Sequence, residues 1–163
     1  YFLEEPLDPY DVRGFAALTQ QSPVKIATGE SLTTVRDFQR FLERRAVDVI
    51  QPDAQQIGIT QFIRVAQRAQ EAGIPCIPHG PWTAFTVAAH LNVLATLANG
   101  IMIEYPAFAR IEGGSAKSAR LDLLHNKVIE HPVELIDGYL QLSEHPGLGL
   151  GDFVVEALDD LTD

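Results

Sequence analysis

Five polar side chains of the kinds used in acid–base and metal chemistry recur along the sequence at nearly constant intervals. They lie 23 to 26 residues apart, and each follows a short apolar run: Glu4, Glu30, Asp53, His79 and Glu104. Short apolar runs are typical of buried strands, and a buried carboxylate is costly unless a partner compensates for it. A metal ion or a catalytic pocket would provide that compensation, so the five positions together predict a functional site.

The chemistry of these groups suggests a division of labour. Glu4 and Glu30 offer hard oxygen ligands from adjacent predicted strands and suit Mg²⁺. Asp53 could hydrogen-bond to His79, which would fix the tautomer of the imidazole and raise its basicity. His79 is therefore a candidate general acid or base, and Glu104 could hydrogen-bond to a substrate oxygen as charge develops there.

The elements that would position these groups alternate between strands and helices. Five segments have the composition of strands: Tyr1–Glu4, Val24–Thr28, Val47–Gln51, Ile74–Pro78 and Ile101–Glu104. The stretches between them have helical periodicity: Pro9–Gln20, Thr33–Arg45, Ile59–Ala72 and Thr83–Ala98. Such alternation predicts a parallel sheet, in which the polar groups at the strand ends would meet at one edge.

The length of the repeating unit favours a barrel. Units of about 25–30 residues suit a (β/α)8 barrel, whose eight units need about 250 residues. Five strands cannot close such a barrel, so we predict an α/β chain in which residues 1–105 form about strands 4 to 8, with the earlier units absent. An open doubly wound sheet is the alternative, although no strand is followed by a Gly-rich phosphate loop.

Residues 106–163 break this pattern and are expected to form a loop, a hairpin and a glycine-rich segment. Lys127–Ile136 has the composition of a strand pair interrupted by a proline. The dipeptide Asp137-Gly138 predicts a tight turn before a further strand at Tyr139–Leu142. The glycines of Pro146–Asp152 are not followed by Lys-Ser/Thr or by a helix, which argues against a nucleotide loop.

Composition limits the partners and the compartment. The 163 residues carry a formal charge of −10, which argues against a nucleic-acid partner. No apolar run approaches the ~20 residues of a membrane span. The single cysteine, Cys76, excludes an internal disulfide framework and suits a reducing compartment, for which we predict the cytoplasm. Cys76 itself is expected to be an inert core thiol.

Several neighbouring residues have a structural interpretation. Glu5 is expected to be a structural partner of a Lys or Arg. His90 lies in an apolar helical stretch and is expected in the core, whereas three other histidines are expected on the surface: His125, His131 and His145. Trp82 follows His79 closely and could either line a substrate pocket or simply pack, so both interpretations stay open.

Six short runs hold the polar residues and the final glycines in a specific order: Phe2-Leu3-Glu4-Glu5-Pro6-Leu7, Ile26-Ala27-Thr28-Gly29-Glu30, Gln51-Pro52-Asp53, Ile77-Pro78-His79, Ile103-Glu104 and Pro146-Gly147-Leu148-Gly149. Over nearly the whole chain this order resembles the C-terminal part of the enolase superfamily, and most of all its mandelate racemase/muconate lactonizing branch. The resemblance implies a (β/α)7β barrel whose final segment returns to an N-terminal capping domain. It also implies a Mg²⁺ that stabilises an enediolate formed by removing a proton α to a carboxylate.

The resemblance implies a role for each polar group: Glu4 rather than Glu5 and Glu30 as metal ligands, Asp53 and His79 as the dyad, and Glu104 as the strand-eight glutamate. The Gly-Gly that commonly follows the dyad aspartate is Gly58-Ile59 here, which would alter a helix start without removing a catalytic group. The remaining metal ligand and the family's lysine-containing strand would precede residue 1. Since the chain does not begin with Met, we expect a missing N-terminal part of the same polypeptide.

Three functions follow as expectations. The leading one is a Mg²⁺-dependent acid-sugar dehydratase that acts on a small hydroxy-acid or acid-sugar substrate, works as a homo-oligomer and expels the β-hydroxyl with His79 as the acid. The second is a racemase or epimerase that uses the same dyad with a second base from the missing part. The third is an inactive or structural fragment of a longer enzyme, whose open strand edges would promote pairing or aggregation.

Overall fold

The computed structural model describes residues 1–80, 83–105 and 127–154. The chain divides into two compact units, of which the first comprises Tyr1–Gly80 and Val93–Glu104 and the second comprises Pro81–Asn92 and Tyr105–Asp163. Among the described residues, no helix is both long and apolar enough to span a membrane.

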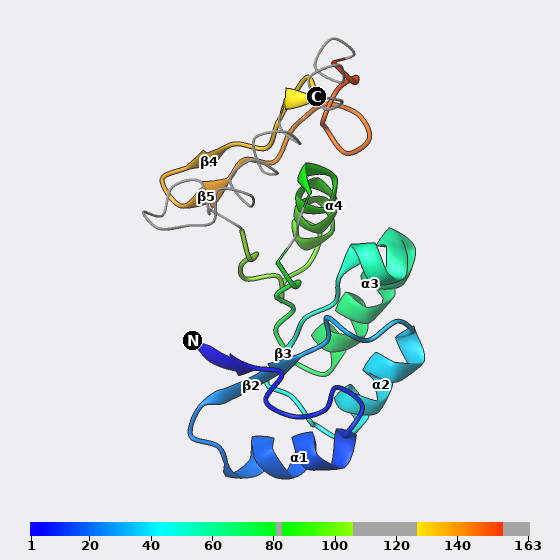
Figure 1. Ribbon diagram of the computed structural model, residues 1–163, viewed down its shortest axis with the longest axis vertical. Helices are drawn as coiled ribbons and strands as arrows, with labels where there is room; N and C mark the ends of the chain where they lie inside the picture. Colours follow the sequence, from blue (N-terminus) through cyan, green and yellow to red (C-terminus); the bar gives the residue numbers. More distant parts are fainter. Residues whose placement is uncertain (81–82, 106–126, 155–163) are drawn as a thin grey trace, which may run out of the picture. The chain divides into compact units, whose positions relative to one another are not determined.

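The first unit is built on a parallel sheet (Figure 1). Strands β1 (Phe2–Glu4), β2 (Lys25–Thr28) and β3 (Val49–Ile50) are neighbours in that order. Single parallel bridges then join β3 to Cys76 and Cys76 to Gly100. The segments therefore follow one another across the sheet in sequence order, which confirms the predicted α/β fold with parallel strands.

Three helices of the first unit connect these strands, namely α1 (Val12–Gln21), α2 (Val35–Glu43) and α3 (Ala54–Glu71). Their apolar faces and one face of the sheet form the main core, whose largest fully buried side chains are aromatic: Phe15, Phe38, Phe41 and Phe62. A smaller cluster of Ala27, Val49 and Ile77 is buried separately from this core. Burial on both faces explains why β2 and β3 are continuous apolar runs rather than alternating ones.

Two predicted segments of the first unit differ from the structure. The strand predicted at Ile74–Pro78 was too long, because it is reduced to one bridge at Cys76. This segment still forms two backbone hydrogen bonds with Ile50: Ile50 N donates to Pro75 O at 3.0 Å, and Ile77 N donates to Ile50 O at 3.0 Å. Prolines on both sides remove two N–H donors and limit the ladder. The strand predicted at Ile101–Glu104 was also wrong, since the bridging residue is Gly100.

Helix α3 shows the consequence of Gly58. The helix begins at Ala54, earlier than the predicted Ile59, but it is interrupted at Gly58, where φ is +71° and ψ is 159°. That backbone conformation is open to glycine and disfavoured for other residues. The helix therefore starts before this glycine and is kinked at it, and whether Gly58-Ile59 alters the helix start relative to the family's Gly-Gly stays a prediction.

The second unit holds most of α4 (Ala84–Leu94) and a short hairpin of β4 (Leu135–Ile136) and β5 (Tyr139–Leu140). The hairpin turn lies at Asp137-Gly138, as predicted, with φ of +50° and +84°. The strand pair predicted over Lys127–Ile136 is smaller than expected, because before β4 only Ile129 is bridged, to Phe153. His90 on α4 is fully buried, as predicted.

Candidate active site

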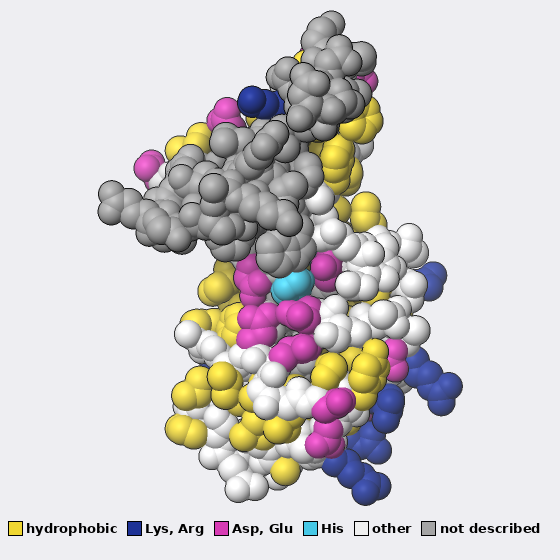
Figure 2. All heavy atoms as spheres, viewed as in Figure 1, with side chains coloured by type: hydrophobic (Ala, Val, Ile, Leu, Met, Phe, Trp, Pro, Cys, Tyr) yellow, Lys and Arg dark blue, Asp and Glu magenta, His cyan; other side chains and the backbone are white. Residues whose placement is uncertain are grey.

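All five polar side chains predicted from their spacing meet in the first unit. His79 lies at the centre, with Nδ1 3.3 Å from Asp53 Oδ2 and Nε2 3.2 Å from Glu30 Oε2. Single ligand atoms of Glu4, His79 and Glu104 lie within 4.8 Å of one another. Figure 2 shows such a gathering of acidic side chains around one histidine. We refer to these five residues as the carboxylate–histidine cluster.

The ends of the parallel strands bring the cluster together. Glu4 is the last residue of β1, and Glu30 follows β2 after the short spacer Gly29. Gly29 has a φ of +146°, and a Cβ at this position would lie 2.7 Å from the carbonyl oxygen of Gln51. Only glycine therefore lets the end of β2 approach the end of β3 so closely, which places Glu30 beside the imidazole.

Asp53 uses its two carboxylate oxygens for different purposes. As the N-cap of α3, it accepts a hydrogen bond through Oδ1 from Gln55 N at 2.7 Å. Its Oδ2 faces His79 Nδ1. Capping a helix orients the carboxylate, and the side chain is almost completely buried. The start of α3 thereby fixes the direction in which the imidazole points.

The electrostatics of the cluster leave an excess of negative charge. Partial burial is the main cause that raises the pKa of Glu4, Glu30 and Glu104, and repulsion between carboxylates raises it further. The pKa of His79 is raised chiefly by its hydrogen bond to Asp53, although desolvation opposes this. A carboxylate group that resists ionisation in this way is one that a cation would stabilise.

The donor set fits a hard divalent cation. Carboxylate oxygens are the ligands that Mg²⁺ prefers, and Glu4, Glu30 and Glu104 provide them within one cluster. The group with the closest mutual approach is Glu4, His79 and Glu104, whereas the sequence predicted Glu4 and Glu30 as ligands. That ligand assignment stays a prediction.

Glu5 is not a member of this cluster, although its charge helps to raise the pKa of Glu30. Its backbone has a φ of +39°, and its carboxylate accepts hydrogen bonds from Thr28 Oγ1 at 2.7 Å and Ser31 Oγ at 3.3 Å. In the described structure these partners are hydroxyl groups and not the Lys or Arg that we expected. The positive φ at Glu5 explains how two consecutive glutamates have different partners: Glu4 lies in the cluster, and Glu5 accepts hydrogen bonds from Thr28 and Ser31.

Sequence reasoning missed Gln51 as a member of this site. Its side chain is fully buried and contacts both Glu4 and Glu104. The available signal was a polar residue at the end of an apolar run, directly before Pro52-Asp53. The sequence predicts Gln51 as the last residue of a strand and as the first residue of the Gln51-Pro52-Asp53 run, with no functional role of its own. The predicted pocket residue Trp82 lies outside the described residues, as does His125.

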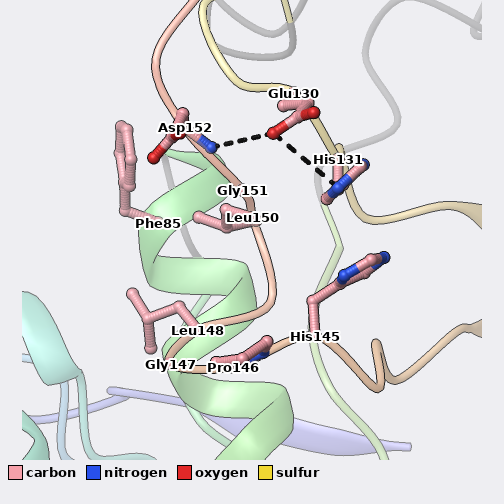
Figure 3. Close-up of a pocket in the computed structure, with 10 residues that line it drawn as sticks. All are labelled: Phe85, Glu130, His131, His145, Pro146, Gly147, Leu148, Leu150, Gly151 and Asp152. Carbon is pink, nitrogen blue, oxygen red and sulfur yellow. Dashed lines mark hydrogen bonds and ion pairs between the residues drawn. The ribbon is translucent and has the colours of Figure 1, made fainter.

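A second pocket lies within the second unit and contains none of the residues predicted to be functional (Figure 3). Its volume is about 480 Å³, and α4 contributes Phe85 to its lining. His131 and His145 stack there with ring centroids 4.1 Å apart and planes at 16°. Glu130 accepts a hydrogen bond from Asp152 N at 3.2 Å and lies 3.8 Å from His131 Nε2. We call this the histidine-pair pocket.

Comparison with known proteins places the chain in a family. Residues 1–151 match the model described as enolase C-terminal domain-like. The L-talarate/galactarate dehydratase of Salmonella typhimurium is 32% identical over 149 residues. That alignment covers 91% of this chain but only 32% of the enzyme, so the chain spans about a third of the length of this curated relative.

Two solved structures share the fold. L-talarate dehydratase from Polaromonas sp. JS666, a complex with Mg and L-glucarate, superposes with a TM-score of 0.74 at 30% identity and covers 97% of this chain and 38% of that one. The mandelate racemase/muconate lactonizing enzyme from Sulfitobacter sp. gives a TM-score of 0.77 at 27% identity, with coverage of 96% and 36%. The chain belongs to the enolase superfamily, as an enolase C-terminal domain-like member of the mandelate racemase/muconate lactonizing enzyme family.

Proposed function

We propose that this chain forms part of an acid-sugar dehydratase, a hydro-lyase, and that it contributes strands 4 to 8 of a (β/α)7β barrel. The observation that carries this proposal is the position of His79, whose two ring nitrogens face Asp53 and Glu30 at 3.3 and 3.2 Å within a cluster of carboxylates. The 32% identity to a talarate/galactarate dehydratase supports an acid sugar as the substrate class.

Asp53 and His79 would act together as a proton donor. With Nδ1–H donated to Asp53, the opposite nitrogen, Nε2, is directed into the carboxylate–histidine cluster. After a base removes the proton α to the substrate carboxylate, Nε2–H protonates the β-hydroxyl, which leaves as water. The resulting enol tautomerises to a 2-keto-3-deoxy acid. The raised pKa of His79 favours the protonated imidazole that this step needs.

The carboxylates would hold the cation and control the charge near the substrate. Glu4 and Glu30 would ligate Mg²⁺, and we propose that a segment N-terminal to these residues supplies a further ligand, in keeping with the greater length of the relatives. When bound, the cation neutralises the negative charge that develops on the substrate carboxylate. Glu104 accepts a hydrogen bond from Gly80 N, which orients it toward the same place.

The test uses the longer polypeptide that contains this chain and a panel of aldonic and aldaric acids. The change His79→Asn should abolish formation of the 2-keto-3-deoxy product while leaving Mg²⁺ affinity within about threefold, because Asn keeps a polar group of similar size. The matched control is His145→Asn in the histidine-pair pocket, which should behave as the wild type. Dehydration by the His79→Asn variant would contradict the proposal.

A racemase or epimerase is the second candidate. It is favoured by the structural similarity to the mandelate racemase/muconate lactonizing enzyme from Sulfitobacter sp.. Reaction in D₂O separates the two functions, since a racemase yields α-deuterated substrate of inverted configuration and a dehydratase yields the keto acid. Deuterium incorporation with inversion and without loss of water would replace the dehydratase proposal.

A further inference from the structure

The side chain of Gln51 links two carboxylates that enter the cluster from strand-end segments far apart in the sequence. Its Nε2 donates hydrogen bonds to Glu4 Oε1 at 3.1 Å and to Glu104 Oε1 at 2.9 Å. A primary amide has two N–H donors, so this pair of bonds uses its full donor capacity. Gln51 is the only residue for which the described structure gives hydrogen bonds to both of these carboxylates.

The orientation of this amide is fixed. The side chain of Gln51 has no exposed surface, and its Oε1 is buried without a hydrogen-bond partner among the described residues. A buried acceptor without a partner is unfavourable. The opposite orientation would be worse, since it would turn the amide oxygen toward two carboxylates. The amide of Gln51 therefore points its NH₂ group at the two carboxylates, and its carbonyl oxygen is left without a hydrogen-bond partner among the described residues.

The backbone of Gln51 is also held in place. Its N–H donates to Thr28 O at 2.9 Å, and its peptide group lies against Gly29, where there is no room for a Cβ. The amide thus extends from a fixed point at the end of β3. A side chain anchored in this way can determine the separation of the groups that it contacts.

Glutamine is also the residue type that suits the charge at this point. Repulsion between Glu4 and Glu104 would drive the two carboxylates apart, and an uncharged double donor between them offsets this without pairing with either as a cation would. Glutamate at position 51 would add a third negative charge. Methionine would fill the space and provide no donor.

We propose that Gln51 is a positioning residue that holds Glu4 and Glu104 at a fixed separation, so that a metal ligand and the carboxylate that faces the substrate stay aligned. The inference rests on the proposed function, because that function gives the two glutamates their roles. It predicts that Gln51 controls cation affinity and turnover without contacting the cation or the substrate.

The test compares Gln51→Met with the wild type in the longer polypeptide. Calorimetric titration with MgCl₂ should show affinity lowered about 10-fold, within the range found when partners of metal ligands are removed, and kcat should fall together with kcat/KM. Gln67→Met makes the same substitution at an exposed position of α3 and should change neither quantity. If Gln51→Met does not fold, Gln51→Asn keeps the amide but falls one methylene short and serves the same comparison.

Coupling distinguishes positioning from general destabilisation. If Gln51 acts through Glu104, the losses in kcat for Gln51→Met and Glu104→Gln should be non-additive in the double variant. Unchanged Mg²⁺ affinity, or fully additive losses, would overturn the inference. If the wild type dehydrates no acid but Gln51→Met still weakens Mg²⁺ binding, the proposed function fails and the positioning role stands.

Discussion

The two units of this protein each place histidine beside carboxylate, but with different results. In the carboxylate–histidine cluster, both ring nitrogens of His79 lie within 3.3 Å of a carboxylate oxygen. In the histidine-pair pocket, His131 lies 3.8 Å from Glu130 and its ring stacks on that of His145. Exposure differs as well, since the Asp53 side chain is 4% exposed and that of Glu130 is 55% exposed.

This difference shows that the neighbouring elements matter more than the residue types. In the first unit, parallel strands carry each polar group to the same edge of the sheet, and α3 fixes Asp53 through its cap. In the second unit, the histidines come from irregular segments on either side of a short hairpin. A partner held by the fold can shift the pKa of an imidazole, whereas an exposed partner is screened by water.

The largest expected effect separates the two histidine–carboxylate pairs. The change Asp53→Asn should lower kcat by about 10²–10⁴-fold, since it removes the carboxylate that orients and charges His79. The matched change Glu130→Gln should leave kcat unaltered. Steady-state kinetics on an acid-sugar substrate measures both. Equal losses in the two variants would remove the distinction between the cluster and the histidine-pair pocket.

Metal binding should follow the same division. The change Glu30→Gln is expected to weaken Mg²⁺ binding at least 10-fold, because it removes a charged oxygen donor, and Glu134→Gln in the exposed part of the second unit should have no effect. Saturating Mg²⁺, at 100 times its Kd, should stabilise the wild type by about 2.7 kcal/mol. Thermal unfolding with and without the cation, followed in both variants, makes the comparison. If Mg²⁺ stabilised the Glu30→Gln variant as much as the wild type, Glu30 would be excluded as a ligand.

The pH dependence of stability should come from the first unit. Because the pKa values of Glu4, Glu30 and Glu104 are raised above 4.5 in the folded chain, the stability that they contribute is complete below pH 4.5 and is lost as pH rises through the folded values. The raised pKa of His79 has the same sign, with its contribution complete below 6.5 and lost above it.

Urea unfolding between pH 4 and pH 8 measures this trend. Without divalent cations the free energy of unfolding should fall over that range, and added Mg²⁺ should restore more of it at pH 7.5 than at pH 4.5. The change His79→Asn should remove the part of the decline above pH 6.5. A free energy of unfolding that rises with pH in the absence of cations would mean that the cluster does not carry unfavourable charge.

The smallest effect is a change of stability confined to the second unit. Gly151 has a φ of +70°, and a Cβ there would lie 2.6 Å from Glu130 Oε2. The change Gly151→Ala should therefore cost about 1–2 kcal/mol of unfolding free energy and leave Mg²⁺ affinity unchanged. Chemical denaturation measures the change in unfolding free energy, and calorimetric titration measures the Mg²⁺ affinity. A loss of Mg²⁺ affinity would show that the two regions depend on each other.

The sequence was most informative where one physical rule repeats. Each polar group follows an apolar run, so its spacing alone predicted that Glu4, Asp53 and His79 would converge, and they do. The strand at Ile74–Pro78 was overextended although Pro75 and Pro78, which lack N–H donors, stand in the sequence and argue against a long ladder. The sequence marked Gln51 as a polar residue at the end of an apolar run, but the two carboxylates that its amide contacts come from distant segments and could not be inferred from that position alone.

Because Glu4 and Glu5 are adjacent at the end of β1, the pairing register of this strand decides which of the two glutamates enters the carboxylate–histidine cluster. Glu4 lies opposite Ala27, and Glu5 N donates to Ala27 O at 3.0 Å. A slip of one residue would put Glu5 in the place of Glu4 and Pro6 in the place of Glu5, so the cluster would keep a carboxylate while Thr28 and Ser31 would lose their acceptor. The hydroxyls of Thr28 and Ser31 bind only the carboxylate of Glu5 in the observed register. These two hydrogen bonds therefore favour the observed register over one shifted by a residue.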